Sequence, residues 1–474
     1  MITLSVVFEV LKGIQPAWTD QVIADVGIDS RKAIPGSMFV ALAGESADGH
    51  DFVQDAFSRG ASFALIDRPV EAGIRVMDLR TGAEVDYEVE LEIPFCLLVD
   101  DALVALQQVA GAWREKLDLR VIGITGSVGK STTKELATIV LKQRYRTLKN
   151  PGNLNNEIGL PMTLWQMGEG HQRAVLEMGF YVPGEIQFLC ELARPSVGVI
   201  TNIGTVHAER AGSQDEIARG KAELVKALPS EPEGTAILNY DDPLVRDMAK
   251  ETDARIFYYG LSEEADLWAD KVEGLGLDGI RFRLNYKGES IHLKVPLIGR
   301  HSVHTALRAA AIALVEGLSW EEISRGLRSE HTQLRLVAVR ASSGAMILDD
   351  TYNASPKSML AGLNLLEEMV GRKIAVLGDM LELGLYENQG HRKVGIRTAE
   401  VADVLVTVGK LGQLIAHAAA EAGLKDESIH SFLNCDEVSE FLKGFLMEKD
   451  VVLVKGSRGL RMDKIVTALE TEYE

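Results

Sequence analysis

The sequence predicts an α/β protein with three domains: a small α/β N-terminal domain, a central parallel-sheet domain and a C-terminal doubly wound, Rossmann-like domain. Three observations predict this. The chain has 474 residues, too many for one ordinary core and enough for about three domains. An apolar run leads into a glycine-rich loop and a helical pattern at residues 121–140. From about residue 319, short apolar runs alternate with helical patterns. We expect domains at residues 1–100, 101–318 and 319–474.

The composition is typical of a soluble globular protein, with 46% hydrophobic and 25% charged residues. The formal net charge of −19 argues against nucleic acid or a membrane surface as a general partner, because both need a basic face. Three widely separated cysteines indicate a reducing compartment rather than disulfides or a zinc site. The N-terminus lacks signal-peptide features and no apolar run reaches membrane-spanning length, so we expect a cytoplasmic protein without membrane insertion.

The first domain is expected to be a small α/β unit. Residues 37–42 and 62–66 are strand-like, and residues 52–59 show a short amphipathic helical pattern. Two polar clusters are rich in residues typical of functional sites: Asp29-Ser30-Arg31, and residues 44–50 with Asp48 and His50. By themselves, both clusters are more typical of polar turns than of binding sites.

The second domain begins with a strand, a glycine-rich loop and a helix at residues 121–133. Gly126 and Gly129 allow the backbone N–H groups to approach phosphate oxygens closely. Lys130 adds a positive charge near the β- and γ-phosphates, and the Ser131 hydroxyl can ligate Mg²⁺. The standard P-loop spacing has its first glycine where this chain has Ile124. We nevertheless predict a P-loop ATPase-type site that binds a nucleoside triphosphate through Gly126, Ser127, Val128, Gly129, Lys130, Ser131 and Thr132.

Polar side chains follow two further strand-like runs of this domain. Glu177 comes directly after residues 174–176, and His207 ends the polar segment that follows the strand near residue 200. Ligands of open α/β sheets bind at the carboxyl ends of strands. Together with Ser131, these two side chains therefore predict a magnesium site.

The rest of the central domain contains an amide-rich loop, a lysine-bearing helix and a β-rich flank. Residues 150–161 offer many directed hydrogen-bond donors, including Asn155 and Asn156. Lys221 lies in a helical pattern that begins near residue 215, and a lysine in such a position is normally a solvated charge. Residues 256–295 are β-rich, and an alanine-rich helix follows to about residue 314.

The last domain shows strand patterns at residues 346–348, 374–377, 404–408 and 451–454, with helices between them. Asp350 and Asn353 follow the first of these strands, and Lys455 and Arg458 follow the last. A positive pair beside a glycine turn suits a carboxylate ligand, although a bare turn remains an alternative. Polar rims at strand ends in all three domains indicate that ligands bind between domains.

Together these motifs resemble the Mur ligases of peptidoglycan synthesis, over essentially the whole chain. The family's loop has the form T-G-S/T-x-G-K-S/T-S/T-T, which residues 125–133 follow and which explains the missing first glycine. Residues 152–161 are similar to the family's asparagine loop. Residues 349–356, 378–384 with His391, and 455–458 are similar to runs of the member that adds D-alanyl-D-alanine. The Asp-Asn-Pro-Arg stretch of the diaminopimelate-adding relative is absent from the last domain's sequence.

The resemblance also implies residue roles. Glu177 and His207 stand where the family places magnesium ligands, and Lys221 matches the lysine that the family carbamylates to hold a second Mg²⁺. Arg335 and Asp350 match positions near the ATP ribose and phosphates. The implied catalytic residues are Lys130, Glu177, His207 and Lys221, and the implied metal ligands are Ser131, Glu177, His207 and carbamylated Lys221. The implied substrate-binding residues are Ser30, Arg31, Asp48 and His50 in a UDP-sugar-binding domain, and Asn155, Asn156, Asn353, Lys455 and Arg458 elsewhere.

The chain departs from the family pattern in two segments. The nucleotide-base motif is usually G-x-H-N-x-x-N, whereas Ser302 and Thr305 replace the two asparagines here. The segment before Arg335 lacks the usual proline and glycine. Neither change falls on the phosphate or metal positions, so we expect ATP turnover to persist with rearranged base contacts.

The resemblance implies an ATP-dependent ligase of peptidoglycan and cell-wall synthesis, and hence of cell shape and division. It would add D-alanyl-D-alanine to UDP-N-acetylmuramoyl-tripeptide through an acyl phosphate, as a monomer that uses ATP and two Mg²⁺ ions. Domain closure would bring Arg335 and Asp350 over the ATP and exclude water. Two alternatives remain: a non-catalytic UDP-sugar-binding protein with the same architecture, and another amide ligase of the superfamily, such as one that adds glutamate to folate.

Overall fold

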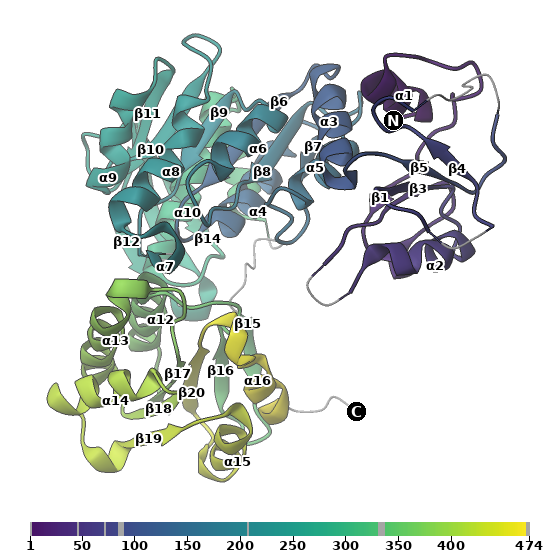
Figure 1. Ribbon diagram of the computed structural model, residues 1–474. Helices are drawn as coiled ribbons and strands as arrows, with labels where there is room; N and C mark the ends of the chain where they lie inside the picture. Colours follow the sequence, from purple (N-terminus) through teal and green to yellow (C-terminus); the bar gives the residue numbers. More distant parts are fainter. Residues whose placement is uncertain are drawn as a thin grey trace. The chain divides into compact units, whose positions relative to one another are not determined.

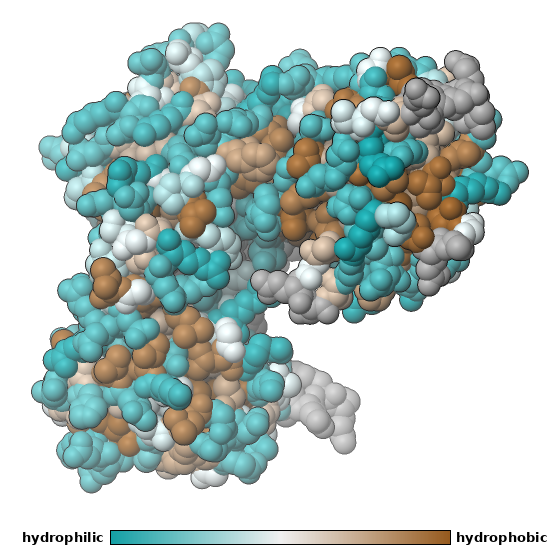
Figure 2. Space-filling view, viewed as in Figure 1, coloured by the Kyte–Doolittle hydropathy of each residue, from teal (hydrophilic) through white to brown (hydrophobic). Residues whose placement is uncertain are grey.

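The computed structural model describes residues 2–44, 47–70, 73–83, 90–205, 208–329 and 337–470. The chain divides into two compact units, Met1–Gly123 with Tyr145–Gly179 and Glu185–Val197, and Ile124–Arg144 with Phe180–Gly184 and Gly198–Glu474. Among the described residues, none of the helices has the length and apolar character needed to cross a membrane. Hydrophilic side chains cover much of the visible face of each unit (Figure 2), as the charged content predicts.

The first unit contains a five-stranded parallel sheet with the order β1-β2-β3-β5-β4 (Figure 1). Its elements are α1 (Leu4–Lys12), β1 (Val26–Gly27), β2 (Met38–Val40), α2 (Val53–Ser58), β3 (Phe63–Ile66), β4 (Val76–Asp78) and β5 (Phe95–Leu98). Every residue of β2, β3 and β5 is buried, as expected for strands covered on both faces. Both predicted strands and the predicted helix of this region are confirmed.

The same unit continues into the first elements of the second domain. These are α3 (Ala102–Glu115), the start of β6 (Arg120–Thr125), β7 (Thr147–Lys149), α5 (Gly159–Trp165), β8 (Arg173–Glu177) and α6 (Glu185–Ala193). Strands β7 and β8 are parallel. The Trp113 indole N–H donates to the Met167 carbonyl at 2.9 Å, which ties α3 to the end of the α5 segment. Glu177 is the last residue of β8 and so lies at the carboxyl end of a buried strand.

The first part of the second unit combines parallel strands with an antiparallel flank. Its elements are α4 (Lys130–Leu141), β9 (Val197–Ile200), α7 (Ala208–Ala211), α8 (Gln214–Lys226), β10 (Thr235–Asn239), α9 (Pro243–Arg246), β11 (Arg255–Gly260), β12 (Leu267–Gly274), β13 (Ile280–Tyr286), β14 (Glu289–Val295), α10 (Val303–Val315) and α11 (Trp320–Leu327). Strands β10, β11 and β12 are parallel, and β12, β13 and β14 pair antiparallel. The predicted β-rich flank is therefore confirmed. Helix α10 packs against α4, the helix of the phosphate loop.

The last part of the chain forms a six-stranded sheet with the order β15-β16-β20-β17-β18-β19. Its elements are β15 (Val337–Arg340), β16 (Met346–Asp349), α12 (Pro356–Glu368), β17 (Arg372–Gly378), α13 (Glu387–Val401), β18 (Val404–Val408), α14 (Gly412–Glu421), β19 (Ile429–Phe432), α15 (Cys435–Phe445), β20 (Asp450–Lys455) and α16 (Asp463–Leu469). Helices α12, α13 and α14 cover one face, and α15 and α16 cover the other (Figure 1). The predicted doubly wound domain is confirmed, with two edge strands, β15 and β19, that the sequence patterns did not reveal.

Candidate functional site

The glycine-rich loop between β6 and α4 has a conformation that only glycine adopts readily. Gly126 has φ +140° and Gly129, the N-cap of α4, has φ +88°. A Cβ atom on Gly126 would overlap with the Thr201 hydroxyl, since the loop passes directly against the end of β9. The predicted strand, glycine loop and helix are therefore present. The first turn of α4 carries the partial positive charge of a helix N-terminus, which favours anions.

Asn202, which the sequence analysis did not single out, holds this loop in shape. Its backbone carbonyl accepts from Ser127 N at 2.9 Å, and its Oδ1 accepts from Val128 N at 3.2 Å. Its Nδ2 donates to the Val128 carbonyl at 2.8 Å, and the Ser127 hydroxyl accepts from Gly204 N at 2.8 Å. The loop is thus fixed by bonds on both of its edges before any ligand contributes. No short-range pattern could reveal Asn202, because it lies 74 residues from its partner.

Lys130 and Ser131 begin the helix that follows the loop. The Lys130 ammonium donates to the Gly126 carbonyl at 2.9 Å, so the lysine folds back across the loop. Ser131 is 9% exposed, and the next residue, Thr132, is half-buried. The Thr133 hydroxyl donates to the Gly129 carbonyl at 2.7 Å. A positive charge and the three hydroxyls of Ser131, Thr132 and Thr133 therefore accompany the backbone amides at this helix start.

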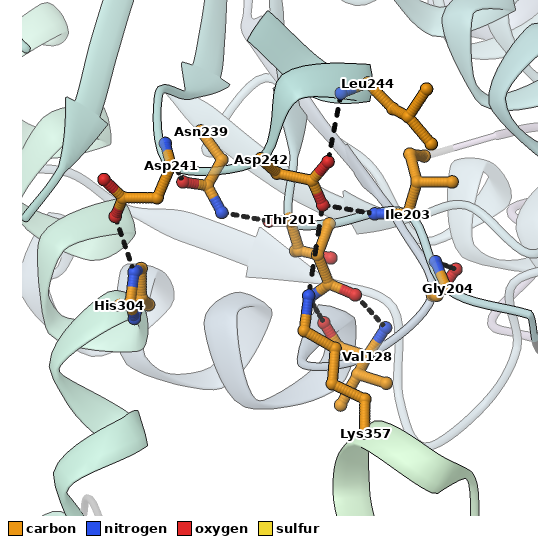
Figure 3. A network of polar contacts seen from close by, with 12 residues as sticks. Val128, Thr201, Ile203, Gly204, Asn239, Asp241, Asp242, Leu244, His304 and Lys357 are labelled. Carbon is orange, nitrogen blue, oxygen red and sulfur yellow. Dashed lines mark hydrogen bonds and ion pairs between the residues drawn. The ribbon is translucent and has the colours of Figure 1, made fainter. Parts of the chain in front are cut away.

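A network of acidic side chains lies beside the loop (Figure 3). The Asp242 carboxylate accepts from Ile203 N at 3.0 Å and from Leu244 N at 3.2 Å. Lys357, in the first turn of α12, brings its ammonium to 3.9 Å from the same carboxylate. Burial lowers the pKa of Lys357, and Asp242 partly opposes that shift. Within the second unit, the start of α12 thus reaches the loops that support the phosphate site.

Asp241 adds a second carboxylate to the same network. It accepts from His304 Nε2 at 2.9 Å and from Leu261 N at 2.8 Å. Burial alone would raise its pKa, but the hydrogen bonds from His304 and Leu261 outweigh burial and lower it. Asp241 is therefore a carboxylate with fixed partners near the start of α10.

Glu177, in the first unit, is enclosed by the amide-rich loop. It is 3% exposed, and its Oε1 accepts from Asn155 Nδ2 at 2.9 Å. Asn150 bonds both backbone groups of Glu177, at 2.9 and 3.0 Å. Asn156 accepts from Gly159 N at 3.0 Å and so supports the start of α5. The structure thus brings Asn155 to Glu177, while Asn156 has a structural partner.

Lys221 is buried, so the interpretation of this residue as a solvated surface lysine is wrong. It lies in α8 with 1% exposure, and its ammonium is 4.5 Å from the centroid of the Phe180 ring. A Cβ on the preceding Gly220 would overlap with the same ring, so glycine is required for this close packing. The helical pattern did not reveal the burial, because Phe180 lies on a distant segment.

The last domain brings together three of the predicted residues. The Lys455 ammonium donates to Asp350 Oδ2 at 2.7 Å and to the Asn353 carbonyl at 2.9 Å. Lys455 is 2% exposed. Arg458 lies 5.9 Å from the centroid of the Tyr352 ring, in a cation–π arrangement. A buried positive charge and a carboxylate thus meet at the carboxyl ends of β16 and β20.

The two N-terminal clusters form local hydrogen-bonded turns. Ser30 donates to Asp55 at 2.8 Å, and Arg31 pairs with Asp29, whose pKa it lowers.

His50 is buried between two carboxylates of the first unit. Its Nδ1 lies 2.8 Å from Asp48 and its Nε2 lies 3.2 Å from Asp67, and Arg68 also pairs with Asp48. The sequence thus correctly placed both clusters in polar turns, while their role in substrate binding stays a prediction.

Three further predictions concern positions or groups that these contacts do not test. His207 and Arg335 lie outside the described residues. Among the described residues, no group of three or more His, Cys, Asp or Glu side chains is arranged to hold a metal ion. The remaining oxygen donors, the Ser131 hydroxyl and the buried Glu177 carboxylate, are of the chemical type that Mg²⁺ prefers.

Comparison with known families gives matches to three successive family models. They are the Mur ligase family, catalytic domain, at residues 22–110, the Mur ligase middle domain at residues 124–313, and the Mur ligase, glutamate ligase domain at residues 334–458. Their order agrees with the three-domain architecture predicted from the sequence. The predicted boundaries at residues 100 and 318 stay predictions.

Individual relatives match over nearly the whole chain. The chain is 36% identical to the UDP-N-acetylmuramoyl-tripeptide–D-alanyl-D-alanine ligase of Bacillus subtilis, over 98% of each chain. The crystal structure of MurF from Acinetobacter baumannii has a TM-score of 0.83 at 32% identity, covering 98% of both chains. The MurF ligase of Thermotoga maritima in complex with ADP has a TM-score of 0.76 at 26% identity, covering 94% of this chain and 96% of that one. This chain, with its phosphate loop, buried Glu177 and doubly wound last domain, belongs to the Mur ligase family.

Proposed function

We propose that this Mur ligase forms the amide bond between the terminal carboxylate of UDP-N-acetylmuramoyl-tripeptide and the amino group of D-alanyl-D-alanine. ATP is converted to ADP and phosphate in the reaction, which supplies a peptidoglycan precursor. The observation that carries the proposal is the preformed phosphate loop, in a chain 36% identical over 98% of its length to a ligase of that name. The same proposal places the protein in the cytoplasm as a monomer, with domain limits at residues 100 and 318.

The chemistry needs an activated acid, because a carboxylate is a poor acyl donor. A carboxylate oxygen attacks the γ-phosphorus of ATP, the bond to the β-phosphate oxygen breaks, and ADP leaves. The amine of the dipeptide then attacks the acyl phosphate through a tetrahedral intermediate. Loss of the amine proton and departure of inorganic phosphate complete the amide bond. Two anionic groups must meet in the first step, so positioning and charge compensation supply much of the rate enhancement.

The phosphate loop would hold the triphosphate through residues 126–132. The amides at the start of α4 are directed by the helix toward an anion, and Lys130 can leave the Gly126 carbonyl to contact phosphate. Arg335 and Asp350 would contact the nucleotide from the last domain. Bonds from Asn202 and Gly204 keep the loop in shape, so little reorganisation is needed when the nucleotide binds.

Two Mg²⁺ ions would be held by Ser131, Glu177, His207 and carbamylated Lys221, and they would neutralise charge on the phosphates and the acyl oxygen. Asn155 fixes one oxygen of Glu177 and so orients the carboxylate. Burial of Lys221 supports the carbamate, because it keeps away the bulk water in which carbamates lose CO₂. A carbamate also replaces an ammonium, which repels metal, with two oxygens that share one negative charge.

The remaining substrate contacts divide between the two ends of the chain. Asn353, Lys455 and Arg458 would bind D-alanyl-D-alanine, since the buried Lys455 ammonium suits its carboxylate. The N-terminal residues Ser30, Arg31, Asp48 and His50 would bind the UDP-sugar, and Asn155 and Asn156 the adjoining substrate. These assignments are made from the family resemblance.

Phosphate release from ATP tests the function. We expect release only when UDP-N-acetylmuramoyl-tripeptide, D-alanyl-D-alanine and Mg²⁺ are all present, and loss of turnover in Lys130→Ala while the circular dichroism spectrum is kept. Nucleotide binding without phosphate release would favour the non-catalytic alternative, and release with a folate substrate would favour the other amide ligase. For the carbamate, ¹³CO₂ labelling should give a carbamate signal that Lys221→Ala removes, and short carboxylates should partly restore activity to that variant.

A further inference from the structure

Arg308, in the middle of α10, is a buried arginine that contacts the phosphate-loop helix. It is 4% exposed. Its Nε donates to the Thr133 hydroxyl at 2.7 Å, and its Nη2 donates to the Thr305 hydroxyl at 2.9 Å. The Thr133 hydroxyl in turn donates to the Gly129 carbonyl at 2.7 Å. The guanidinium is therefore connected through one side chain to the last residue of the loop.

The guanidinium also lies directly against the loop. A Cβ atom on Gly129 would be 2.9 Å from Arg308 Nη2, and Gly129 has the left-handed φ of +88°. A side chain at this turn of the loop would therefore crowd the guanidinium, so glycine is required there. The positive charge is thus held at the start of α4, where the helix already favours an anion.

The charge of Arg308 is not balanced by a carboxylate of the residues that the structure describes. Within the part of the chain that the structure describes, no carboxylate lies at ion-pair distance from this guanidinium, and its hydrogen-bond acceptors are two neutral hydroxyls. The centroid of the Tyr259 ring lies 5.8 Å from the guanidinium carbon, in a cation–π arrangement. Burial of a charge without a counter-ion costs stability, so such groups are kept where a bound anion completes the pair.

The segment before Arg308 contains Ser302 and Thr305, which replace the two asparagines of the family's nucleotide-base motif. The Ser302 hydroxyl donates to the Ile298 carbonyl at 2.7 Å, His304 is bonded to Asp241, and Thr305 accepts from Arg308. The Ser302, His304 and Thr305 side chains therefore already have protein partners. They hold α10 and Arg308 in place.

We propose that Arg308 is a positioning residue of the nucleotide site: it fixes the turn of the phosphate loop and supplies a charge that the β- and γ-phosphates neutralise. The chain then holds the nucleotide more through its phosphates than through its base. This inference rests on the proposed ATP-dependent function and names the residue that replaces lost base contacts.

The test replaces Arg308 with Met, which keeps the length and apolar stem but removes the charge. Because the buried charge is uncompensated without nucleotide, the melting temperature of the nucleotide-free variant should stay the same or rise. The Kd and the KM for ATP should increase about 10- to 100-fold, the loss expected for hydrogen bonds and charge compensation of a buried cation. The KM for D-alanyl-D-alanine and the Kd for AMP should stay unchanged, since neither ligand carries β- or γ-phosphates.

Two further variants keep the test decisive. Arg308→Lys retains the charge without the two-pronged geometry and should recover most of the ATP affinity. Thr305→Val keeps the arginine but removes one acceptor, so it should raise the KM for ATP only a few-fold. If Arg308→Met does not fold, the ATP affinity and the KM for ATP of these two variants still test the proposal.

Arg114→Met is the matched control. Arg114 is also buried, at 8% exposure, but it donates to three backbone carbonyls, those of Ala193, Leu117 and Leu119. Its replacement should lower the melting temperature and leave the ATP affinity unchanged. The inference is overturned if Arg308→Met behaves like this control, or if its ATP affinity falls less than threefold. Failure of the unaltered chain to bind ATP would instead refute the proposed function.

Discussion

The phosphate loop and the charged rim of the last domain both lie at the carboxyl ends of parallel strands, yet they are built by different physics. The loop is fixed by its backbone conformation, with positive φ at Gly126 and Gly129, and by hydrogen bonds between its backbone and Asn202. The rim is fixed by a buried ion pair between Lys455 and Asp350. The loop should therefore be most sensitive to added atoms, and the rim to removed charge.

The largest effect is expected for Gly126→Ala. The new methyl group would overlap with the Thr201 hydroxyl, and φ +140° is unfavourable for any residue with a Cβ. Strain and overpacking together should lower the free energy of unfolding by about 3 kcal/mol. Displacement of the loop should weaken ATP binding at least about 100-fold, because a shift near 1 Å disrupts such a site. Chemical denaturation and calorimetric titration with ATP measure the two effects.

Gly13→Ala separates the conformational cost from the steric one. Gly13 has φ +70°, but a Cβ there would meet nothing within 4 Å. Its replacement should cost only about 1 kcal/mol and leave ATP binding unchanged. Equal losses of stability in the two variants would contradict the role of the Thr201 contact.

Lys455→Met should have the next largest effect. The substitution keeps the buried stem and removes the ammonium, which leaves the Asp350 carboxylate without its partner at 2.7 Å. We expect a loss of about 1–3 kcal/mol in unfolding free energy, since one member of a mostly buried pair remains uncompensated. The KM for D-alanyl-D-alanine should rise, while the KM for ATP changes less.

A double-mutant cycle with Asp350→Asn checks the origin of that loss. If the ion pair is responsible, the two substitutions together should cost less than the sum of the single ones, by about 1 kcal/mol or more. Lys443→Met, which breaks an exposed pair with Glu440, should change stability by no more than about 0.5 kcal/mol. Strict additivity in the first cycle would rule out the pair as the cause.

The same comparison shows which parts of the site the sequence reveals. The loop was predictable because its glycines, lysine and serine are contiguous and their spacing follows from the phosphate geometry. The meeting of Asp350, Asn353 and Lys455 was predictable because residues after parallel strands share one edge of a sheet. Both predictions rest on rules that need no knowledge of distant packing.

The supporting residues escaped prediction for the opposite reason. Asn202 and Arg308 lie 74 and 175 residues from the partners they hold, so no local pattern connects them. The burial of Lys221 depends on Phe180, which a helical pattern does not include. The edge strands β15 and β19 were missed because they are short, and β19 is only partly buried, so it lacks the continuous apolar run of a central strand.

The smallest predicted effect is on the pH dependence of the unfolding free energy, and it concerns the segment around His391 in the last domain. His391, which is fully buried, donates from Nδ1 to the Glu387 carbonyl at 2.7 Å and accepts from Met380 N at 3.0 Å. Burial lowers its pKa from 6.5, so the folded protein keeps the ring neutral where the unfolded chain binds a proton. The free energy of unfolding should therefore decrease as the pH falls below 6.5, with a slope of at most about 1.4 kcal/mol per pH unit from this group.

His391→Gln should flatten this part of the pH profile, because an amide does not titrate. The exposed His417 provides the control, and His417→Gln should leave the slope as it is. Urea denaturation from about pH 7.5 to about pH 5.5, in steps of about half a pH unit, measures the difference between the variants. Since protonation would direct an Nε2–H toward the Met380 N–H, acid should loosen the segment that Met380 begins. An unchanged slope in His391→Gln would show that protonation of His391 does not cause the loss of stability in acid.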